Sequence, residues 1–369
     1  MIHFIIGTKA QFVKMAPLMF LLEQEQTPYR LLDLGQHAAL TGAILNDFGI
    51  HPAVSHVSTA RGNVENYRQA LPWLLACARL ILSKRKRLLE RHFNGASGGV
   101  LIHGDTASTL LGLYLGKRAG LRVGLVEAGL SSHRLFDPFP EEIIRRHAEH
   151  RADFLFAPDS VAESRLRAMD LRGAICNTLY NTGLDAVSLI IQRHNLMAAP
   201  PDAGTYSILT LHRLETLTSG RKLRRAIQHA IRLAGCMGPV RFFLHGPTRL
   251  ALERQRLMEM LNDNPAFTLA PLLPYPEFIR QILHCRYLLT DGGSIQEEAA
   301  YLHVPCLILR SRTERQHGLG NNARLATFDV KSDCDFLKAA DNGRNGFHHN
   351  HDLAASRRIM DFMKHAVSC

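Results

Sequence analysis

Residues 290–298 combine the side-chain types that bind a phosphate and a sugar. Their sequence, Thr-Asp-Gly-Gly-Ser-Ile-Gln-Glu-Glu, follows an apolar run and precedes a helical pattern, which predicts a strand, a glycine turn and a helix. Glycines let the backbone approach a ligand, and the N–H groups of a first helical turn favour an anion. Glu297 and Glu298 could accept hydrogen bonds from sugar hydroxyls. The stretch indicates a nucleotide or nucleotide-sugar site, although a simple capping turn would explain Gly-Gly-Ser alone equally well.

Polar side chains follow the predicted strands at other places along the chain. They belong to Gly7-Thr8-Lys9, His103-Gly104-Asp105, Glu127-Ala128-Gly129, His212-Arg213 and His245. In doubly wound α/β domains, the loops at the carboxyl ends of the strands carry the functional residues. A turn or a cap is the simpler explanation for any one of these residues, but their repetition at strand ends predicts a shared cleft.

Apolar segments of two kinds alternate along the chain and would position these residues. Short runs typical of buried strands occur at residues 2–6, 31–34, 99–103, 122–126, 154–157, 207–211, 240–245, 287–291 and 306–310. Helical patterns separate them at residues 12–22, 38–47, 64–92, 107–119, 141–149, 184–197, 221–235, 250–261 and 352–366. This alternation predicts an α/β fold with parallel sheets that helices cover on both faces.

The length of 369 residues favours two domains, and the Ala- and Pro-rich segment 198–204 marks the region of their boundary. We expect an N-terminal Rossmann-like domain at residues 1–182, a C-terminal one at 183–350, and a last helix at 351–369 that packs back on the first domain. Two doubly wound Rossmann-like domains that face a cleft are therefore the predicted architecture.

The composition argues against several classes of protein. No run of eighteen apolar residues occurs, and residues 1–7 lack the features of a signal peptide, so we expect a cytoplasmic protein without membrane insertion. The seven cysteines are dispersed without a Cys-x-x-Cys pair, which is typical of reduced thiols. We expect no metal at His348, His349 and His351, because acidic or thiolate partners are missing nearby. Without a Gly-x-Gly-x-x-Gly fingerprint, we also expect no flavin or nicotinamide cofactor.

The formal charge of +11 is compatible with nucleic acid, lipid or small anionic ligands. Its densest run, residues 84–87, lies within the helical pattern at 64–92 and is interpreted as a solvated helix face. Attraction of this run to anionic lipid, at roughly 1 kcal/mol per basic residue, is the alternative. We expect no nucleic-acid partner.

Together these motifs resemble the UDP-N-acetylglucosamine 2-epimerases. The resemblance covers residues 3 to about 325 and rests on motifs in the family's order, namely Gly7-Thr8-Lys9, residues 14–18, Gly35-Gln36-His37, residues 103–106, 126–130 and 138–142, His212-Arg213 with Glu215, residues 290–298 and Thr313-Glu314-Arg315. It implies a glycosyltransferase-B-like fold, with the catalytic acids in the N-terminal domain and UDP held mainly by the C-terminal domain. Relatives are commonly homodimers, and the substrate is a UDP-sugar.

The resemblance also implies a reaction. A base takes the C2 proton of the hexosamine while UDP departs from C1, which gives a glycal, and UDP adds back with protonation on the other face of C2. This chemistry requires carboxylates on both sides of C2, cations around the leaving diphosphate and exclusion of water. The product, UDP-N-acetylmannosamine, would supply surface polysaccharides.

Individual residues take their expected roles from the family motifs. Asp105, Glu127 and Glu141 match the acidic trio, and His212 matches the histidine at the leaving phosphate, so these four are the expected catalytic residues. Which carboxylate is the base and which the acid stays open. Glu298 matches the residue that holds the ribose. The other expected substrate-binding residues are Lys9, Lys14, Arg145, Arg213, His245, Gly292, Gly293, Ser294 and Arg315.

Several positions depart from the family pattern. The family's Gly-Thr-Arg-Pro-Glu is replaced by residues 7–11, Gly-Thr-Lys-Ala-Gln, and lysine lacks the bidentate fork of arginine. Ser131 stands where relatives have arginine. Residues 38–40 offer few polar groups for the second substrate molecule that activates some relatives.

The outcome of the reaction has two readings. Ala10 and residues 145–148 resemble a sister group that hydrolyses its intermediate to N-acetylmannosamine and UDP, whereas His212-Arg213 and residues 126–129 and 140–142 resemble the reversible, non-hydrolysing group. We favour the reversible reaction, because its motifs lie at the chemistry. A glycosyltransferase of the same fold and a non-catalytic nucleotide-sugar sensor are the alternatives from other classes.

Overall fold

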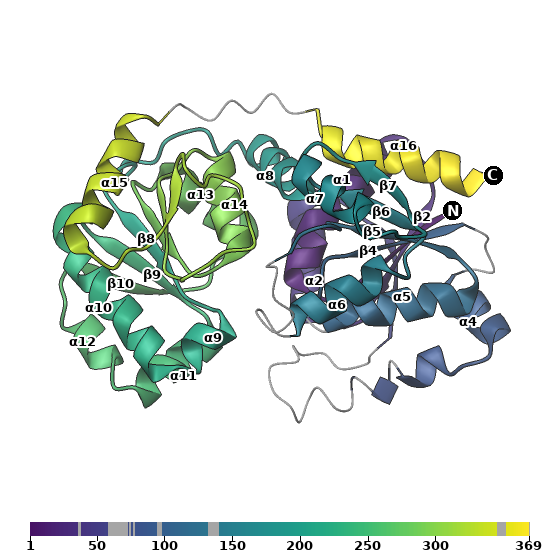
Figure 1. Cartoon of the computed structure of the whole chain (residues 1–369), viewed down its shortest axis with the longest axis horizontal. Helices are drawn as coiled ribbons and strands as arrows, with labels where there is room; N and C mark the ends of the chain where they lie inside the picture. Colours follow the sequence, from purple (N-terminus) through teal and green to yellow (C-terminus); the bar gives the residue numbers. More distant parts are fainter. Residues whose placement is uncertain are drawn as a thin grey trace. The chain divides into compact units, whose positions relative to one another are not determined.

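The computed structural model describes residues 1–35, 38–57, 73, 75–76, 78–93, 98–131, 140–344 and 352–368. The chain divides into two compact units, Met1–Leu189 with His351–Cys369, and Ile190–Asn350 (Figure 1). Each unit contains one parallel sheet between helices, so the predicted α/β fold with two Rossmann-like domains is confirmed. Among the described residues, no helix has the length and apolar character of a membrane span.

The first unit is built on a seven-stranded sheet with the order β3-β2-β1-β4-β5-β6-β7. Its strands are β1 (Ile2–Ile6), β2 (Tyr29–Asp33), β3 (Ala53–His56), β4 (Gly99–His103), β5 (Arg122–Val126), β6 (Phe154–Ala157) and β7 (Ala174–Asn177). Its connecting helices are α1 (Lys9–Gln24), α2 (Ala38–Phe48), α4 (Arg85–His92), α5 (Ala107–Ala119), α6 (Glu141–Glu149), α7 (Ser160–Arg167) and α8 (Thr182–Arg193). The strand order reverses between β1 and β4, the switch point at which such sheets bind ligands.

The central strands of this sheet are buried on both faces, which explains their apolar sequences. Every residue of β1 and β4 is buried, as expected for parallel strands covered by helices. Helix α5 approaches them closely because a glycine faces the sheet: a Cβ on Gly112 would lie 2.7 Å from Cγ2 of Ile102. The packing of α5 therefore fixes the end of β4, from which Asp105 projects.

The last helix, α16 (Ala354–Ser368), belongs to the first unit. Its Phe362 ring packs against Phe154 and Phe156 of β6, with ring centroids 5.5 Å apart in each pair. Ser356 donates to the buried carboxylate of Asp185 in α8 from its backbone N–H, at 2.8 Å, and from its hydroxyl, at 2.6 Å. Helix α16 thus anchors α8, the helix along which the chain passes from the first unit to the second.

The second unit has a six-stranded sheet with the order β10-β9-β8-β11-β12-β13. Its strands are β8 (Ser207–Thr210), β9 (Val240–Leu244), β10 (Phe267–Pro271), β11 (Leu288–Thr290), β12 (Cys306–Ile308) and β13 (Ala323–Leu325). Its helices are α9 (Leu214–Leu217), α10 (Gly220–Met237), α11 (Gly246–Arg254), α12 (Met258–Asn262), α13 (Tyr275–His284), α14 (Gly293–Tyr301) and α15 (Val330–Asn342). The order reverses between β8 and β11, so this sheet has a switch point of the same kind.

A disulfide joins Cys236 of α10 to Cys334 of α15, with their Cα atoms 6.3 Å apart. The prediction of reduced thiols is therefore wrong for this pair. The physical reason is that α10 and α15, far apart in the sequence, pack together in the second unit. Cys176, Cys285 and Cys306 are free thiols.

The single helix predicted for residues 64–92 is wrong where the structure describes it. The backbone is extended at Lys84, with φ −61° and ψ 134°, and α4 begins after this residue. The Ser83 hydroxyl donates to the Leu80 carbonyl at 2.7 Å, a local bond that competes with helix continuation. The described basic residues of the run, Lys84 to Lys86, are exposed as predicted. Residues 58–72 and the histidines at 348, 349 and 351 lie outside the described residues.

Candidate active site

Asp105 and Glu127 follow neighbouring strands of the first sheet. Strands β4 and β5 pair in parallel with His103 opposite Val126, so the residues after them meet at one edge of the sheet. Lys9 and Glu141 are the first residues of α1 and α6. The first sheet thus brings the three predicted acids to its carboxyl edge, together with two predicted cations, Lys9 and Lys14.

Glu127 is buried and has a positive φ of 66°. This left-handed conformation costs a non-glycine residue on the order of 1–3 kcal/mol, a strain that clusters at functional sites. Its Oε2 accepts hydrogen bonds from Nζ of the buried Lys14 and from Nδ2 of Asn181, the latter at 2.5 Å. Nε2 of His103 lies 3.6 Å from the same oxygen. The Glu127 carboxylate is therefore held from α1, from β4 and from the start of α8.

Asp105 is held from α6 by a buried arginine. The guanidinium of Arg145, whose side chain is 2% exposed, donates to Asp105 through Nη2 and to Glu142 through Nη1, the latter at 2.5 Å. Glu142 is fully buried and also accepts from the Ser131 hydroxyl at 2.6 Å. Arg145 was predicted to bind substrate, but its guanidinium bridges two carboxylates of the protein.

Gln11 ties the start of α1 to the end of β4. Its Oε1 accepts from the N–H of Gly7 at 3.0 Å, and its Nε2 donates to the His103 carbonyl at 2.7 Å. The Thr8 side chain caps the same helix by accepting from the Gln11 N–H. An amide can serve both sides of this contact, because it donates and accepts, whereas an ionised carboxylate only accepts.

Asp291 organises the carboxyl edge of the second sheet. It is buried, follows β11 and accepts the backbone N–H groups of His212, at 2.9 Å, and Arg213, at 3.1 Å. Both of these residues follow β8, which pairs with β11. One carboxylate thus fixes the turn that carries two predicted leaving-group residues.

The His212 ring lies against the glycine turn. A Cβ on Gly292 would lie only 2.2 Å from Cε1 of His212, so the contact requires glycine. The ring centroid of His245, which caps α11, lies 5.3 Å from that of His212. Burial lowers the pKa of His212, and Asp291 opposes this only partly. The imidazole is therefore neutral at neutral pH and can donate from one nitrogen while accepting at the other.

Three guanidinium groups gather around Glu314 beside this turn. Arg213 forms an ion pair with Glu314, and Nη1 of Arg310 lies 3.2 Å from Oε2 of Glu314. Burial raises the pKa of Glu314, but the charges of Arg213, Arg315 and Arg310 outweigh burial and lower it to about 2. A Cβ on Gly293 would lie 3.1 Å from Oε1 of Glu314. Ordered arginines from the segments after β8 and β12 thus lie beside the start of α14, the place predicted for the diphosphate.

The remaining predicted ligands lie along α14 and after β12. Glu298 accepts a hydrogen bond from the Tyr275 hydroxyl at 3.1 Å, and Ser294 is the second residue of the helix. Arg315 donates to the buried Glu297 at 2.9 Å. Glu297, considered above as a sugar ligand, is therefore engaged by an arginine.

The predicted residues fall into two groups, one at the carboxyl edge of each sheet. Four residues that hold these groups in place were not predicted from the sequence, namely Asn181, Glu142, Glu314 and Gln11. Glu142, Glu314 and Gln11 lie in the motifs named above, so their polar side chains were a signal in the sequence. Asn181 follows β7, a strand that was not predicted, and no signal pointed to it.

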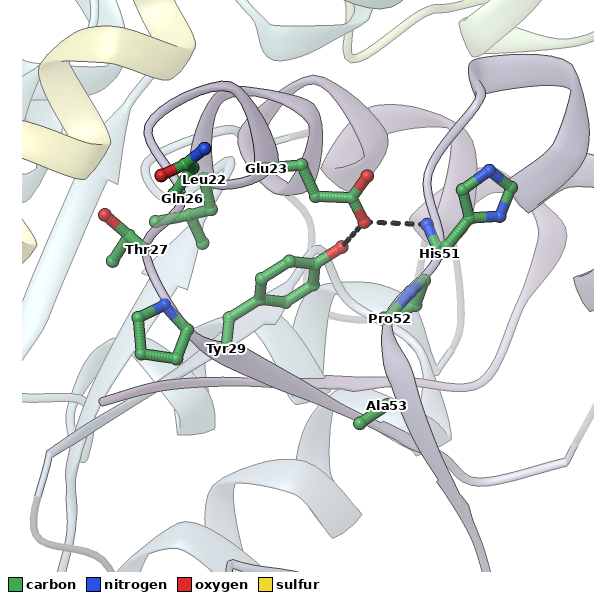
Figure 2. A pocket seen from close by; sticks show the side chains of 9 residues that line it. Leu22, Glu23, Gln26, Thr27, Tyr29, His51, Pro52 and Ala53 are labelled. Atoms are coloured by element: carbon green, nitrogen blue, oxygen red, sulfur yellow. Dashed lines mark hydrogen bonds between the residues drawn. The ribbon is translucent and has the colours of Figure 1, made fainter.

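A hollow of about 340 Å³ on the first unit lies away from these residues (Figure 2). It is lined by the end of α1 and the starts of β2 and β3. Oε1 of Glu23 accepts from the Tyr29 hydroxyl and from the His51 N–H, at 2.7 Å each. Because strands begin here, the hollow is at the amino edge of the sheet and does not belong to the candidate site.

Comparison with known proteins gives one consistent family. A family model described as UDP-N-acetylglucosamine 2-epimerase matches residues 21–334. UDP-N-acetylglucosamine 2-epimerases from Methanocaldococcus jannaschii and Bacillus subtilis are 25% and 27% identical, and the alignments cover 89% and 97% of this chain and 88% and 93% of those relatives. A putative UDP-N-acetylglucosamine 2-epimerase structure from Listeria monocytogenes shares the fold, with a TM-score of 0.82, 23% identity, and 99% and 96% of the two chains covered.

Proposed function

Because the chain belongs to the UDP-N-acetylglucosamine 2-epimerase family, we propose that it interconverts UDP-N-acetylglucosamine and UDP-N-acetylmannosamine by elimination and re-addition of UDP. The catalytic residues of this proposal are Asp105, Glu127, Glu141 and His212. The product serves the synthesis of surface polysaccharides.

The observation that carries the proposal is the pair of carboxylates after β4 and β5. Glu127 is aimed by a positive φ and held by Lys14, and Asp105 is held by Arg145. Epimerisation removes a weakly acidic proton from C2 and returns a proton on the other face, so it requires two positioned acid–base groups. A simple transfer of the sugar does not require such a pair. This favours epimerisation over the glycosyltransferase and sensor alternatives.

The second sheet supplies a site for the leaving group. The N–H groups at the start of α14, the neutral His212 and the guanidiniums of Arg213 and Arg315 would bind the diphosphate, and Glu298 would bind the ribose. A neutral imidazole is suited to pass a proton to a departing phosphate oxygen and to take it back on re-addition. No redox or metal cofactor is needed for these steps.

Reversible epimerisation is preferred to hydrolysis of the intermediate. The motifs around Glu127, Glu141 and His212 resemble those of the non-hydrolysing group, and these residues carry the proposed chemistry. On the same family grounds we propose that the protein is a homodimer in the cytoplasm. Light scattering of the purified protein and fractionation of cells would check these two points.

Incubation with UDP-N-acetylglucosamine in D2O tests the reaction. Deuterium at C2 of the recovered UDP-sugars, in both the gluco and manno isomers, is the expected result. Free N-acetylmannosamine and UDP as the only products would show the hydrolysing reaction instead. Binding without exchange or release would favour a sensor, and transfer to an added glycan without exchange would favour a transferase.

A further inference from the structure

We propose that Asn181 is a positioning residue that fixes the Glu127 carboxylate for proton transfer. This inference rests on the proposed function, in which Glu127 exchanges a proton with C2 of the sugar. Asn181 lies between β7 and α8, and none of the motifs of the sequence includes it.

The Asn181 amide is bonded on both sides. Its Nδ2 donates to Oε2 of Glu127 at 2.5 Å, and its Oδ1 accepts from the N–H of Gly183 at 2.8 Å. The side chain is buried, with the residue 2% exposed. Because the Gly183 N–H can only donate, the amide oxygen must face it, which leaves the NH₂ group to face Glu127.

Glu127 needs such a contact because its last torsion is poorly fixed. The χ3 angle of glutamate is broad, so the side chain alone does not set the plane of the carboxylate. Lys14 of α1 and Asn181, which precedes α8, both donate to Oε2, and His103 lies near the same oxygen. Two donors that converge on one oxygen from different elements hold the plane in a single orientation.

The two donors differ in charge, which separates their roles. Lys14 balances the negative charge of Glu127, whereas the neutral amide of Asn181 fixes direction without further neutralising the carboxylate. A base with two cationic partners would bind its proton more weakly. An amide at this position therefore orients Glu127 and lowers its basicity less than a second cation would.

The residues on either side of Asn181 are anchored by the C-terminal helix. The Tyr180 hydroxyl accepts from the N–H of Ala354 at 3.1 Å, and Asp185 accepts from Ser356 twice. The residues before and after Asn181 are thus tied to α16. The chain segment that enters the second unit through α8 begins with the residue that orients Glu127.

Asn177 provides a matched control four positions earlier. Its Oδ1 accepts from the N–H of Leu179 at 2.7 Å, and its Nδ2 donates to Oε2 of Glu163 at 2.8 Å. The two asparagines thus make the same pair of hydrogen bonds. In each, Oδ1 accepts from the backbone N–H two residues later, and Nδ2 donates to a glutamate carboxylate. Glu163 is on α7 and has no part in the proposed chemistry.

The test compares Asn181→Ala and Asn181→Asp with Asn177→Ala and Asn177→Asp. The rate of C2 deuterium incorporation into saturating UDP-N-acetylglucosamine is measured against pH, together with KM and the melting temperature. We expect Asn181→Ala to lower kcat by about tenfold to a hundredfold, the cost of a small misplacement, with KM changed less than about twofold. Asn181→Asp places a second carboxylate beside Glu127, so the acidic limb of the pH–rate profile should move to higher pH.

The Asn177 variants should keep the kcat and the pH profile of the wild-type protein. Two results would overturn the role of Asn181 while leaving the proposed function intact. One is an unchanged pH–rate profile in the Asn181 variants. The other is a loss of activity that follows the loss of melting temperature, as in the Asn177 variants. Absence of exchange in the wild-type protein would instead overturn the proposed function, and this inference with it.

Discussion

His212 packs so closely on Gly292 that a Cβ added there would lie 2.2 Å from its Cε1. We predict that Gly292→Ala displaces the imidazole and weakens UDP binding by about fivefold to a hundredfold, because overpacking of this kind costs about 1–3 kcal/mol. Isothermal titration with UDP measures the effect. Gly246→Ala is the control: this glycine likewise lies at the start of a helix, and a Cβ there would meet no atom within 4 Å. Equal UDP affinity of both variants would contradict the proposed place of His212.

Arg145 bridges Asp105 and Glu142, and we predict that it holds the first unit together as well as the site. Arg145→Ala leaves the fully buried Glu142 without its main cation, and breaking a buried pair costs about 3–5 kcal/mol. Chemical unfolding should show this loss, and exchange at C2 should fall with it. Arg146 contacts the same carboxylate from the surface, at 3.4 Å, so Arg146→Ala should cost less than about 1 kcal/mol. Similar losses in the two variants would refute the bridging role.

The elements that sequence analysis found are the buried centre of each sheet. Strands β1, β4, β5, β8 and β9 have apolar runs because helices cover both their faces. The strands that it missed, β3, β7, β10 and β13, are the four edges of the two sheets. Edge strands are partly exposed and carry polar residues, so no apolar run marks them. In β3 (Ala53–His56), for example, each residue is either exposed or half-buried. Pattern alone therefore finds the centre of a parallel sheet more readily than its rim.

The same physical reason explains what was missed in the site. Asp105, Glu127 and His212 follow central strands and were found from their position. Asn181 follows the edge strand β7, and its role depends on a carboxylate 54 residues earlier. The disulfide was missed because spacing does not show which helices pack together. Contacts between distant segments need the three-dimensional fold.

His3 should make the first unit sensitive to acid. It is 1% exposed in β1 against the ring of Phe93, and no described residue gives either ring nitrogen a hydrogen bond. Burial, with the charges of the N-terminus and Arg30, lowers its pKa from 6.5 to about 4. Between these values the unfolded chain binds the proton and the folded one does not, so stability falls as the pH drops from 6.5 to 4.

The buried His3 lowers the unfolding free energy by about 3 kcal/mol at and below pH 4, relative to neutral pH. Leucine has no proton to bind, so His3→Leu should not show this loss. As the pH falls from 6.5 to 4, the unfolding free energy of the variant should therefore rise relative to that of the wild-type protein, by about 3 kcal/mol. Urea unfolding at pH 7.5, 5 and 4 measures the difference. A difference that does not vary with pH would show that His3 is protonated in the folded state as readily as in the unfolded one.

The Cys236–Cys334 disulfide should stabilise the second unit. It closes a loop with a sequence separation of 98 residues, and a bridge of this kind contributes about 2–4 kcal/mol. Dithiothreitol should lower the unfolding free energy of the wild-type protein by that amount and leave a Cys236→Ser, Cys334→Ser double variant unchanged. Cys176→Ser, which removes a free thiol, is the control. Because a reducing cytoplasm disfavours such bridges, thiol counting on freshly lysed cells would show whether the bond forms there.

Glu298 should carry much of the affinity for the nucleoside part of the ligand. The Tyr275 hydroxyl donates to it at 3.1 Å, and burial raises the pKa of Tyr275, so this phenol stays protonated and orients the carboxylate. A hydrogen bond to a charged group contributes about 1.5–3 kcal/mol, so Glu298→Ala should weaken UDP binding by about tenfold to a hundredfold. Tyr275→Phe, which keeps the carboxylate but frees its orientation, should have a smaller effect. Glu259→Ala, on the exposed side of α12, should leave UDP affinity unchanged. If titration showed Glu298→Ala to bind UDP like the control, the ribose would have to be held by another residue, and the ribose-binding role proposed for α14 would be wrong.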